Sequence, residues 1–465
     1  MKTREQIEER DERELEKRRR QFNLKPLKYG LALTLLALFL AGITDELTSS
    51  INNQVQSSVV TEFFAKPLSL PYNEAMSVFS SVRIFSYLFM LICPFYKALA
   101  DKLGRKPFLV LNTVGMGVGL LLAAWSPNVV VYFIGYGFMT FFVMHDMQIV
   151  YLYEIAPKEK RATIYGLIKG IGSLSAVVIP LLRAAVMGND STLWRGVYLV
   201  PALIALGVSL FTFLVTRESP TFLDQRIAFL EQPYEKRYLT KKPKGEKQKN
   251  KQQKTGVFQA MGHLFRNRQL RWLAIVSLVF TISSTTISSF SESIMADFGM
   301  ATESVTQALF FYPFLFAALG CLAGFIGDRF GRKKIISVSG VLAAAGFVCF
   351  NISAWQGMSP YIVGIFYGLY LSCWWLTVDY VSMMVAESAP TYNRGSILGA
   401  VGLISTVGSA LGQVLPVGAS LLFDRIGFGY MTAVMPFVTV GVILLLWKVK
   451  ETKGVDLDTV VYEDE

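Results

Sequence analysis

Charged residues are scarce over most of this chain, and their distribution constrains its fold more than any other feature. Residues 1–28, 217–271 and 448–465 hold 45 of the 79 Asp, Glu, Lys and Arg residues, and the other 364 positions hold 34. A water-soluble domain of that size needs far more charges to cover its surface. Despite the formal net charge of +11, the sequence therefore predicts a membrane protein. It argues against a soluble enzyme, a nucleic-acid-binding protein and a disordered scaffold.

The apolar stretches between these segments have the length of membrane-spanning helices. A bilayer core about 30 Å thick needs roughly 20 apolar residues in a helix. A charged segment after the sixth stretch divides twelve such stretches into two sets of six. We predict an all-α membrane protein with twelve transmembrane helices in two pseudo-symmetric six-helix bundles. The predicted spans are 28–48, 76–97, 107–126, 129–153, 164–187, 195–216, 270–291, 304–327, 335–355, 360–384, 396–422 and 428–448.

The charged segments divide the chain into five parts. Residues 1–27 alternate in charge at helical spacing, which predicts a solvated helix held by i,i+4 ion pairs, with contact to the membrane surface as the alternative. Residues 28–217 and 270–449 are expected to form the bundles, and 218–269 a basic, partly disordered linker. Residues 450–465 form a second tail. With the N-terminus inside, 39 of the 45 Lys and Arg residues lie on the cytoplasmic side, so both termini are expected there.

The two halves repeat a short motif after their second spans. KALADKLGRKPF (97–108) and GFIGDRFGRKKI (324–335) share Asp, Gly, Arg and Lys at the same spacing. An Asp at a helix end can accept hydrogen bonds from a neighbouring helix N-terminus and pair with a basic residue. A positive-inside cluster explains the basic residues but not the repeated Asp–Gly–Arg spacing. The gate residues predicted from this motif are Asp101, Gly104, Arg105, Asp328, Gly331 and Arg332.

A second motif repeats after the fourth spans of the two halves. YEIAPKEKR and AESAPTYNR both read Glu-x-x-Pro-x-x-x-Arg. Internal repeats of this kind are typical of secondary transporters. We predict that four further residues belong to the same cytoplasmic gate: Glu154, Arg161, Glu387 and Arg394.

On these motifs the chain resembles the major facilitator superfamily from about residue 28 to 455. The twice-occurring Asp-x-x-Gly-Arg-Lys loop is similar to the superfamily's signature. ESPTFL (218–223) and ETKG (451–454) are similar to motifs of the sugar-porter and metabolite–proton symporter branches. The resemblance implies a central cavity and alternating access. The chain departs from sugar porters in span four, which lacks the arginine that they pair with the span-one aspartate.

Ionisable residues in the outer half of the first two spans form one candidate site. Charged side chains within a bilayer are costly and mark functional positions. At 1.5 Å per helical residue, Asp45 and Arg83 both lie roughly 26 Å from the cytoplasmic face. We therefore expect Asp45 or Glu46 to pair with Arg83, either as a static brace or as an outer gate that titrates.

A second group of ionisable residues is expected deeper in the bundles. Asp146 and Lys169 both lie roughly 12 Å in and can neutralise each other, with His145 as a titratable neighbour. A purely structural pair is the alternative. Asp379 has the equivalent depth in the second half, where spans seven to twelve offer no basic partner at that level. Such a carboxyl suits proton binding and release. Contact with a substrate amine and a hydrated carboxylate facing the cytoplasm are the alternatives.

Aromatic and hydroxyl side chains suggest a wall of the substrate cavity. Tyr and Trp rings can stack on sugars while donating hydrogen bonds, and aromatic packing within the bundle is the alternative. Span seven carries more Ser and Thr than a lipid-facing helix requires, although such hydroxyls can also bond their own backbone. The predicted cavity-lining residues are Tyr367, Tyr370, Trp374, Trp375, Ser284, Thr285 and Ser288.

These features predict a secondary active transporter that takes up a small polar organic solute, a sugar or an organic acid, with protons. We expect a monomer in a plasma membrane, that of a bacterium. A proton antiporter exporting an organic cation is the first alternative, although span five lacks the Gly-Pro element typical of drug–proton antiporters. A non-transporting nutrient receptor is the second. We find no nucleophile–base set, metal-ligand spacing or phosphate-binding loop. We therefore expect no enzymatic activity, no cofactor or metal, and no nucleic-acid partner; the expected partners are the solute, protons and the lipid bilayer.

Overall fold

The computed structural model describes residues 4–24, 30–70, 72–143, 147–157, 159–187, 190–235, 237, 257–300, 302–390, 393–422 and 433–455. Within these ranges every regular element is a helix. Each of the twelve predicted spans coincides with one or more of these helices. Among the described helical stretches, nine are long and apolar enough to cross a bilayer.

Helices of the first half occupy predicted spans one to six. They are α2 (Gly30–Gln54) with α3 (Gln56–Val60), η1 (Thr61–Ala65) and α4 (Lys66–Leu68) after it; α5 (Tyr72–Ile84), α6 (Tyr87–Met90) and α7 (Cys93–Leu103); α8 (Arg105–Ala124); α9 (Val129–Val143) and α10 (Met147–Ile155); α11 (Arg161–Ser173), η2 (Leu174–Val177), α12 (Val178–Leu182) and η3 (Arg183–Met187); and η4 (Ser191–Leu193) with α13 (Trp194–Val215).

Helices of the second half occupy spans seven to twelve. They are α16 (Arg268–Asp297), α17 (Thr302–Leu309) with α18 (Tyr312–Phe330), α19 (Arg332–Trp355), α20 (Pro360–Ser388), α21 (Arg394–Leu422), and α23 (Met435–Leu445) with η6 (Leu446–Lys448).

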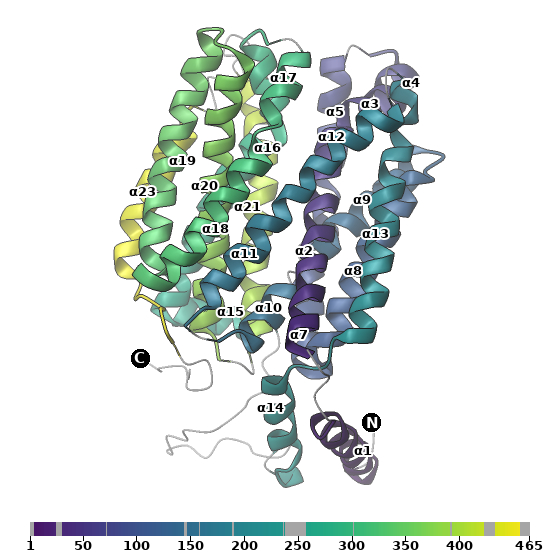
Figure 1. Cartoon of the computed structure of the whole chain (residues 1–465), viewed down its shortest axis with the longest axis vertical. Helices are drawn as coiled ribbons and strands as arrows, with labels where there is room; N and C mark the ends of the chain where they lie inside the picture. The colour runs from purple at the N-terminus through teal and green to yellow at the C-terminus, as the bar shows by residue number, and fades with distance from the viewer. Residues whose placement is uncertain are drawn as a thin grey trace.

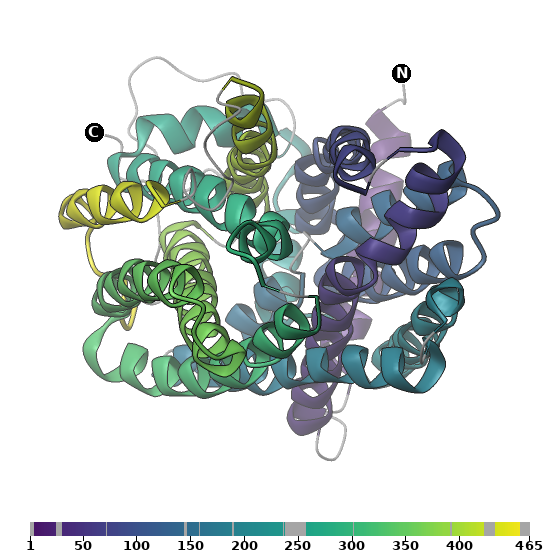
Figure 2. The ribbon, with the colours of Figure 1, turned by 90° about the horizontal axis from the view of Figure 1, so that it is seen from above.

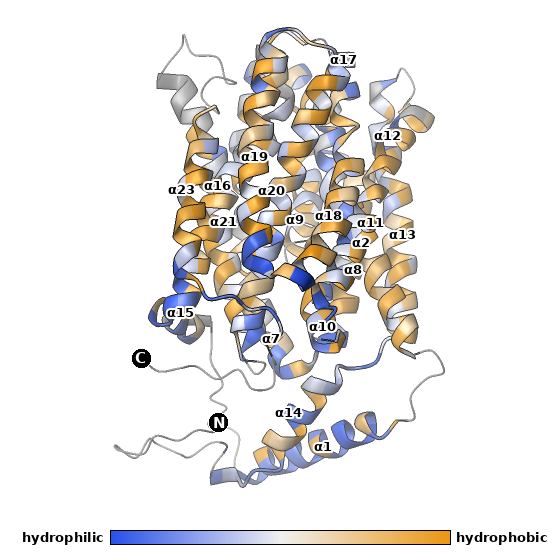
Figure 3. Ribbon diagram, turned by 60° about the vertical axis from the view of Figure 1, so that its left-hand side comes forward, coloured by the Kyte–Doolittle hydropathy of each residue, from blue (hydrophilic) through white to orange (hydrophobic). Residues whose placement is uncertain are grey.

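The two halves stand side by side, with their long helices along the longest axis of the molecule (Figures 1 and 2). Three helices lie at one end: α1 (Arg4–Phe22), α14 (Pro220–Leu230) and α15 (Val257–Arg266). We call this end the tail side and the opposite end the far side. Apolar residues dominate the long helices, whereas hydrophilic residues dominate α1, and α14 and α15 carry residues of both kinds (Figure 3). This division is the one expected for a bilayer around the long helices.

Spans two, five and eight are interrupted rather than straight. Pro313 stands in the first turn of α18, directly after α17. Proline has no backbone N–H to donate and its ring clashes with the preceding turn, so it favours the start of a new helix over continuation of the one before it. Span five passes from α11 through the 3₁₀ turn η2 to α12 and the π-helical η3. These breaks bend the helices that meet at the contact between the two halves.

Span five and span eight cross through glycines. A Cβ atom on Gly166 would lie 2.6 Å from the carbonyl oxygen of Gly320, and one on Gly170 would lie 2.9 Å from that of Ala317. Small residues let two helix backbones approach closely within a membrane. This crossing of α11 and α18 holds the two halves together next to the cavity described below.

The N-terminal tail forms the predicted helix with i,i+4 ion pairs, such as Arg4–Glu8 and Arg20–Glu16. It is not solvated on every face, because α1 packs on α14 and buries Asp11 and Arg18. The predicted linker begins with α14 and ends with α15. Most of its basic run, residues 238–256, lies outside the described residues.

Candidate functional site

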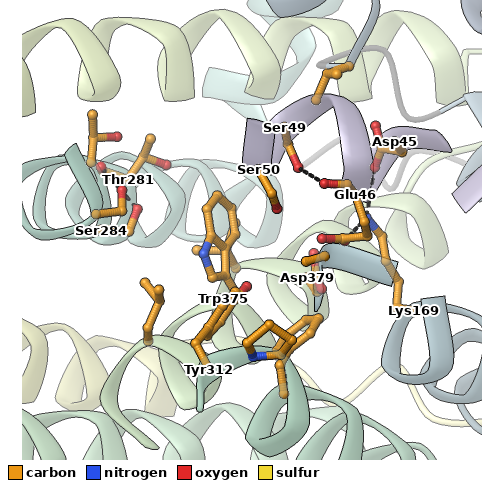
Figure 4. Close-up of a pocket in the computed structure, with 18 of the residues that line it drawn as sticks. Asp45, Glu46, Ser49, Ser50, Lys169, Thr281, Ser284, Tyr312, Trp375 and Asp379 are labelled. Atoms are coloured by element: carbon orange, nitrogen blue, oxygen red, sulfur yellow. Dashed lines mark hydrogen bonds and ion pairs between the residues drawn. The ribbon is translucent and has the colours of Figure 1, made fainter. Parts of the chain in front are cut away.

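A cavity of about 590 Å³ lies between the two halves. Residues of α2 and α11 line it from the first half, and residues of α16, α18, α20 and α21 line it from the second. Its lining reaches Gln54 and Ser291, toward the far-side ends of α2 and α16. Figure 4 shows the polar part of this cavity.

An ion-pair cluster forms the wall contributed by the first half. The Nζ atom of Lys169 lies 3.2 Å from Oδ2 of Asp45 and 3.7 Å from Oε1 of Glu46 (Figure 4). All three side chains are largely buried. Charges removed from water persist only with close partners, so Lys169 fixes the two carboxylates of α2 against α11.

The predicted pairing of Arg83 with Asp45 or Glu46 is wrong. The Arg83 guanidinium instead donates to two glutamine amides, with 2.7 Å from Nη2 to Oε1 of Gln413 and 3.4 Å from Nη1 to Oε1 of Gln56. The depth estimate assumed straight helices and gave the level of Arg83 but not the direction of its side chain. Because Arg83 and Gln413 belong to different halves, their bond joins α5 to α21.

The expected contact of Lys169 with Asp146 cannot be followed, because Asp146 and His145 lie outside the described residues. The cation that Asp45 contacts comes from span five, and the sequence pointed to no such contact. Spacing along one helix does not reveal which neighbouring helix approaches it, so this pairing had no signal in the motifs.

Asp379 reaches the same cavity from α20 in the second half. Figure 4 shows it on the side of the cavity where Lys169 and Glu46 lie. The prediction of a lone carboxyl considered only spans seven to twelve. Lys169 of the first half lines the same cavity, and Asp379 has interaction partners in the structure, so Asp379 is not isolated.

Hydroxyl groups of α16 and α21 form the opposite wall. Ser284, Thr285 and Ser288 line the cavity. Some of these hydroxyls are engaged locally: Ser284 Oγ donates to the carbonyl oxygen of Thr281 at 3.2 Å, and Thr285 Oγ1 lies 3.3 Å from Ser409 Oγ of α21. The wall therefore offers a row of small polar groups that can exchange such bonds for bonds to a solute.

The aromatic residues of α20 divide between the cavity and the core. Tyr367 and Trp375 line the cavity. The prediction for Tyr370 and Trp374 is wrong, because both are buried outside it, with Tyr370 against Phe347 (ring centroids 4.9 Å apart) and Trp374 against Phe280 (4.8 Å). Tyr370 and Trp374 share one face of α20, and that face points into the bundle. The cavity face of α20 comprises Tyr367, Leu371, Trp375, Val378, Asp379 and Ser382.

The first repeated motif folds into a buried ion-pair network, which we call the first latch (Asp101, Arg105, Glu154 and Glu218). The Arg105 guanidinium lies 2.9 Å from Asp101 and 3.0 Å from Glu154, and it donates to the carbonyl oxygen of Ala100 at 2.7 Å. The guanidinium thus ties the end of α7 to α10.

The second repeat forms a matching network, the second latch (Asp328, Arg332, Glu387 and Glu451). Arg332 lies 3.2 Å from Asp328 and 2.9 Å from Glu387, and it donates to the carbonyl oxygen of Gly327 at 3.0 Å. Equivalent residues therefore make equivalent contacts in the two halves.

The aspartate of each latch reaches into the other half. Asp101 Oδ2 accepts from the backbone N–H of Ser396 at 3.0 Å, in the first turn of α21. Asp328 accepts from the N–H groups of Ala162 at 3.1 Å and Thr163 at 2.7 Å, in the first turn of α11. A carboxylate at a helix N-terminus satisfies free N–H groups and is favoured by the helix dipole.

The glutamates and arginines of the second motif pair across the halves. Arg394 lies 3.7 Å from Glu154, and Arg161 lies 3.6 Å from Glu387. Together with the aspartate caps, these contacts join the two halves on the tail side of the cavity.

Two glutamates of the latches were not among the predicted site residues. Glu218 accepts from the backbone N–H groups of Arg105 at 2.6 Å and Lys106 at 3.2 Å. Burial raises the pKa of Glu218, although these N–H groups stabilise its charged form. In the second half Glu451 accepts in the same way from Arg332 at 2.9 Å and Lys333 at 3.0 Å. In the sequence, the two glutamates were noted only because their motifs are similar to those of the sugar-porter and symporter branches.

The glycine of each latch is required by the glutamate beside it. Gly104 has φ of 117° and Gly331 has φ of 100°. A Cβ atom would lie 2.0 Å from Glu218 Oε2 at the first position and 2.4 Å from Glu451 Oε2 at the second. Only glycine avoids both the positive φ and the clash.

No metal centre accompanies these carboxylates. Within the part of the chain that the structure describes, no group of three or more His, Cys, Asp or Glu side chains is arranged to hold a metal ion.

Comparison with known proteins gives the family. A family model described as the Major Facilitator Superfamily matches residues 29–413. The chain belongs to the Major Facilitator Superfamily. This superfamily member is 24% identical over 395 residues to the glucose transporter GlcP of Staphylococcus epidermidis, which covers 78% of this chain and 83% of the relative. It is 23% identical over 387 residues to the putative metabolite transport protein YwtG of Bacillus subtilis, with 78% and 81% covered.

Solved structures share the fold at low identity. The proton:xylose symporter XylE bound to 6-bromo-6-deoxy-D-glucose matches with a TM-score of 0.65 at 18% identity, over 94% of this chain and 99% of that one. The human organic anion transporter MFSD10 matches with a TM-score of 0.66 at 16% identity, over 89% of this chain and 99% of that one. The predicted fold of twelve helices in two bundles is therefore confirmed. The chain is a multi-pass membrane transporter, and its relatives are transporters rather than enzymes.

Proposed function

We propose that this transporter carries a sugar across the membrane by alternating access, coupled to protons as a symporter. The observation that carries the proposal is the composition of the cavity. A buried Lys–carboxylate cluster on α2 and α11 faces a hydroxyl-lined wall on α16 and α21. Such a cavity offers many small hydrogen-bonding groups together with carboxylates that can exchange a proton.

A neutral sugar fits the charge of the cavity better than an organic acid. The described lining residues include three carboxylates (Asp45, Glu46 and Asp379) and two cations (Lys169 and Arg183). Since both Asp45 and Glu46 lie close to Lys169, an anionic solute would meet mostly paired or like charge. Trp375 and Tyr312 add flat rings on which a sugar can stack. The names of a glucose transporter and a xylose symporter among the similar proteins support the same substrate class.

The proton would act on the Asp45–Lys169 pair and on Asp379. A carboxylate that takes up a proton loses its attraction for the neighbouring ammonium, so protonation of Asp45 releases α2 from α11. Asp379, which reaches the same side of the cavity from α20, gives the second half a titratable group of its own. Each group would then hold one half in position until a proton and a solute arrive together.

The latches would act as the gate of the tail side. They are made in the present structure, and the cavity lining runs from Val150 and Leu398, near the latches, to Gln54 and Ser291 toward the far side. This arrangement corresponds to a state whose tail side is closed. We assign the tail side to the cytoplasm, because the excess of Lys and Arg lies there. We place the protein in a bacterial plasma membrane, in keeping with its bacterial relatives.

Coupling variants test this proposal in proteoliposomes. Asp379→Asn and Asp45→Asn should abolish accumulation of sugar driven by a proton gradient while retaining counterflow exchange, which needs no net proton movement. Asp224→Asn, the same change at an exposed carboxylate of α14 outside the cavity, serves as the matched control. Accumulation that survives in the Asp379→Asn variant would remove Asp379 from the coupling role.

A proton antiporter for an organic cation is the second candidate. The excess of carboxylates over cations among the described lining residues favours it. An antiporter would acidify the external medium when a cation is supplied on that side of a loaded vesicle. Organic cations and protons would also compete for the cavity, and added sugar would not change that competition.

A further inference from the structure

The N-terminal helix α1 is docked on α14 through charged side chains (Figures 1 and 3). Glu14 accepts a bidentate contact from Arg226, at 2.8 Å from Nε and 2.7 Å from Nη2. Asp11, of which only 1% is exposed, lies 2.6 Å from Arg237. The bidentate Glu14–Arg226 pair joins two planar groups and so fixes one relative position of α1 and α14. The Asp11–Arg237 contact ties α1 to the segment that follows α14.

One residue of α1 reaches past α14 to the first latch. Arg18 Nη2 donates to the carbonyl oxygen of Leu103 at 2.8 Å. The Arg18 guanidinium also lies 5.2 Å from the ring centroid of Phe222, and the Arg105 guanidinium lies 5.2 Å from the same centroid. Phe222 is therefore shared by a residue of the N-terminal helix and the central arginine of the latch, in two cation–π contacts.

The carbonyl of Leu103 needs a donor from outside its own helix. Leu103 ends α7, and the last carbonyls of a helix have no intrahelical partner. At the corresponding turn of the second latch, Lys453 donates to the carbonyl oxygen of Arg329 at 2.9 Å. The second latch thus receives its donor from the segment that follows span twelve, whereas the first receives it from the start of the chain.

We propose that α1 is a positioning element of the first latch. Arg18 and the α1–α14 contact hold the turn that carries Asp101 and Arg105, so that Asp101 stays bonded to the first turn of α21. Docked α1 then favours the closed tail side, and undocking of α1 favours its opening. The contact itself is independent of any substrate, and only its consequence for transport rests on the proposed alternating access.

Hydrogen–deuterium exchange of the full-length protein in detergent tests this proposal. In Arg18→Ala the amides of Arg105, Lys106 and Ser396 should exchange roughly ten- to a hundredfold faster, the size expected for loss of one charge-assisted hydrogen bond. Amides of Lys333 and Thr163 in the second latch should keep their rates. Arg18→Lys should restore most of the protection, because an ammonium can still donate to the Leu103 carbonyl.

A matched control and a charge exchange separate positioning from general destabilisation. Arg20→Ala, on the exposed face of α1 with a contact only to Glu16 of its own helix, should leave every rate unchanged. Glu14→Arg and Arg226→Glu should each speed exchange at Ser396, and the double variant should restore it. Unchanged protection at Ser396 after α1 has become fast-exchanging, or equal acceleration in both latches, would overturn the proposal. Since no substrate is present, either result leaves the proposed transport function untouched.

Discussion

The two latches share their residues and their spacing, but they differ in how completely the buried glutamate is bonded. Glu387 uses both oxygens: Arg332 donates to Oε1 at 2.9 Å and to Oε2 at 3.2 Å, and Thr452 Oγ1 donates to Oε2 at 2.6 Å. In the first latch Arg105 donates only to Oε1 of Glu154. Oε2 of Glu154 has no hydrogen-bond partner among the described residues.

One part of this difference is a hydroxyl that the two halves use differently. Thr452 follows Glu451 directly, and Ser219 follows Glu218 in the same way. Thr452 donates into the second latch, whereas Ser219 accepts from the backbone N–H of Phe222 and begins α14. In the first half the Ser219 hydroxyl therefore caps α14, the helix on which α1 packs. A repeated motif can thus produce two ion-pair networks of unequal strength, and we infer that the first is the weaker.

Removing the central arginine should have the largest effect. Arg105→Ala leaves Glu154 with Arg394 at 3.7 Å, whereas Arg332→Ala leaves Glu387 with Thr452 at 2.6 Å as well as Arg161. A buried carboxylate that loses its partner costs about 3–5 kcal/mol. Thermal unfolding in detergent should show a larger loss for Arg105→Ala, with the exposed Lys102→Ala unchanged. A larger loss for Arg332→Ala would reverse the comparison.

Filling the glycine positions should have the next largest effect. An alanine at Gly104 or Gly331 adopts a positive φ at a cost of about 1–3 kcal/mol and also meets a glutamate oxygen. The Cβ distance of 2.0 Å at Gly104 against 2.4 Å at Gly331 makes Gly104→Ala the more damaging. The melting temperatures of the two variants show which substitution destabilises the protein more. Adding Glu218→Ala to Gly104→Ala should recover only the part due to the clash, and full recovery would show that φ contributes nothing.

Removing the extra hydroxyl should make the second latch resemble the first. Thr452→Val keeps the shape of the side chain and deletes the donor to Glu387, at a cost of about 1–2 kcal/mol. Amides of Lys333 and Thr163 should then exchange as fast as those of Lys106 and Ser396. If the two latches remain unequal in this variant, the hydroxyl does not explain their difference.

Lowering the pH should have the smallest effect, through the Glu14–Arg226 pair that docks α1 on α14. Burial alone would raise the pKa of Glu14, but the hydrogen bond and charge of Arg226 outweigh it and lower the pKa. The stabilisation of the folded state is therefore complete above the ordinary value of 4.5 and is lost as pH falls through the lowered pKa. We expect the pair to stabilise the folded state by under about 1 kcal/mol, because it is partly exposed. Loss of α1 docking between pH 7 and pH 5, measured by exchange in α1, would contradict this account.

Sequence reasoning succeeded where the signal is periodic or repeated. Apolar length located all twelve spans, and duplication identified Asp101, Arg105, Glu154 and their counterparts, which the structure brings together in two networks. Apolar length and repeated motifs depend on the sequence of each helix alone, and not on which neighbour the helix packs against.

The sequence could not predict contacts that depend on which face of a helix meets which neighbour. The depth estimate placed Arg83 and Asp45 at one level, yet Arg83 bonds Gln413 and Asp45 bonds Lys169. The pattern at Tyr370 and Trp374 marked a shared face of α20 but not the direction in which that face points. The docking of α1 was missed because its surface is charged, and a charged helix was taken to be solvated.

Proton movement in proteoliposomes tests the central claim most directly. External pH is recorded while pooled sugars, organic acids and organic cations are added in turn to vesicles that hold the purified protein. Proton-coupled sugar symport predicts external alkalinisation with the sugar pool and no response to the organic acids. Acidification on addition of the cation pool, or no proton movement with any pool of sugars, would contradict it.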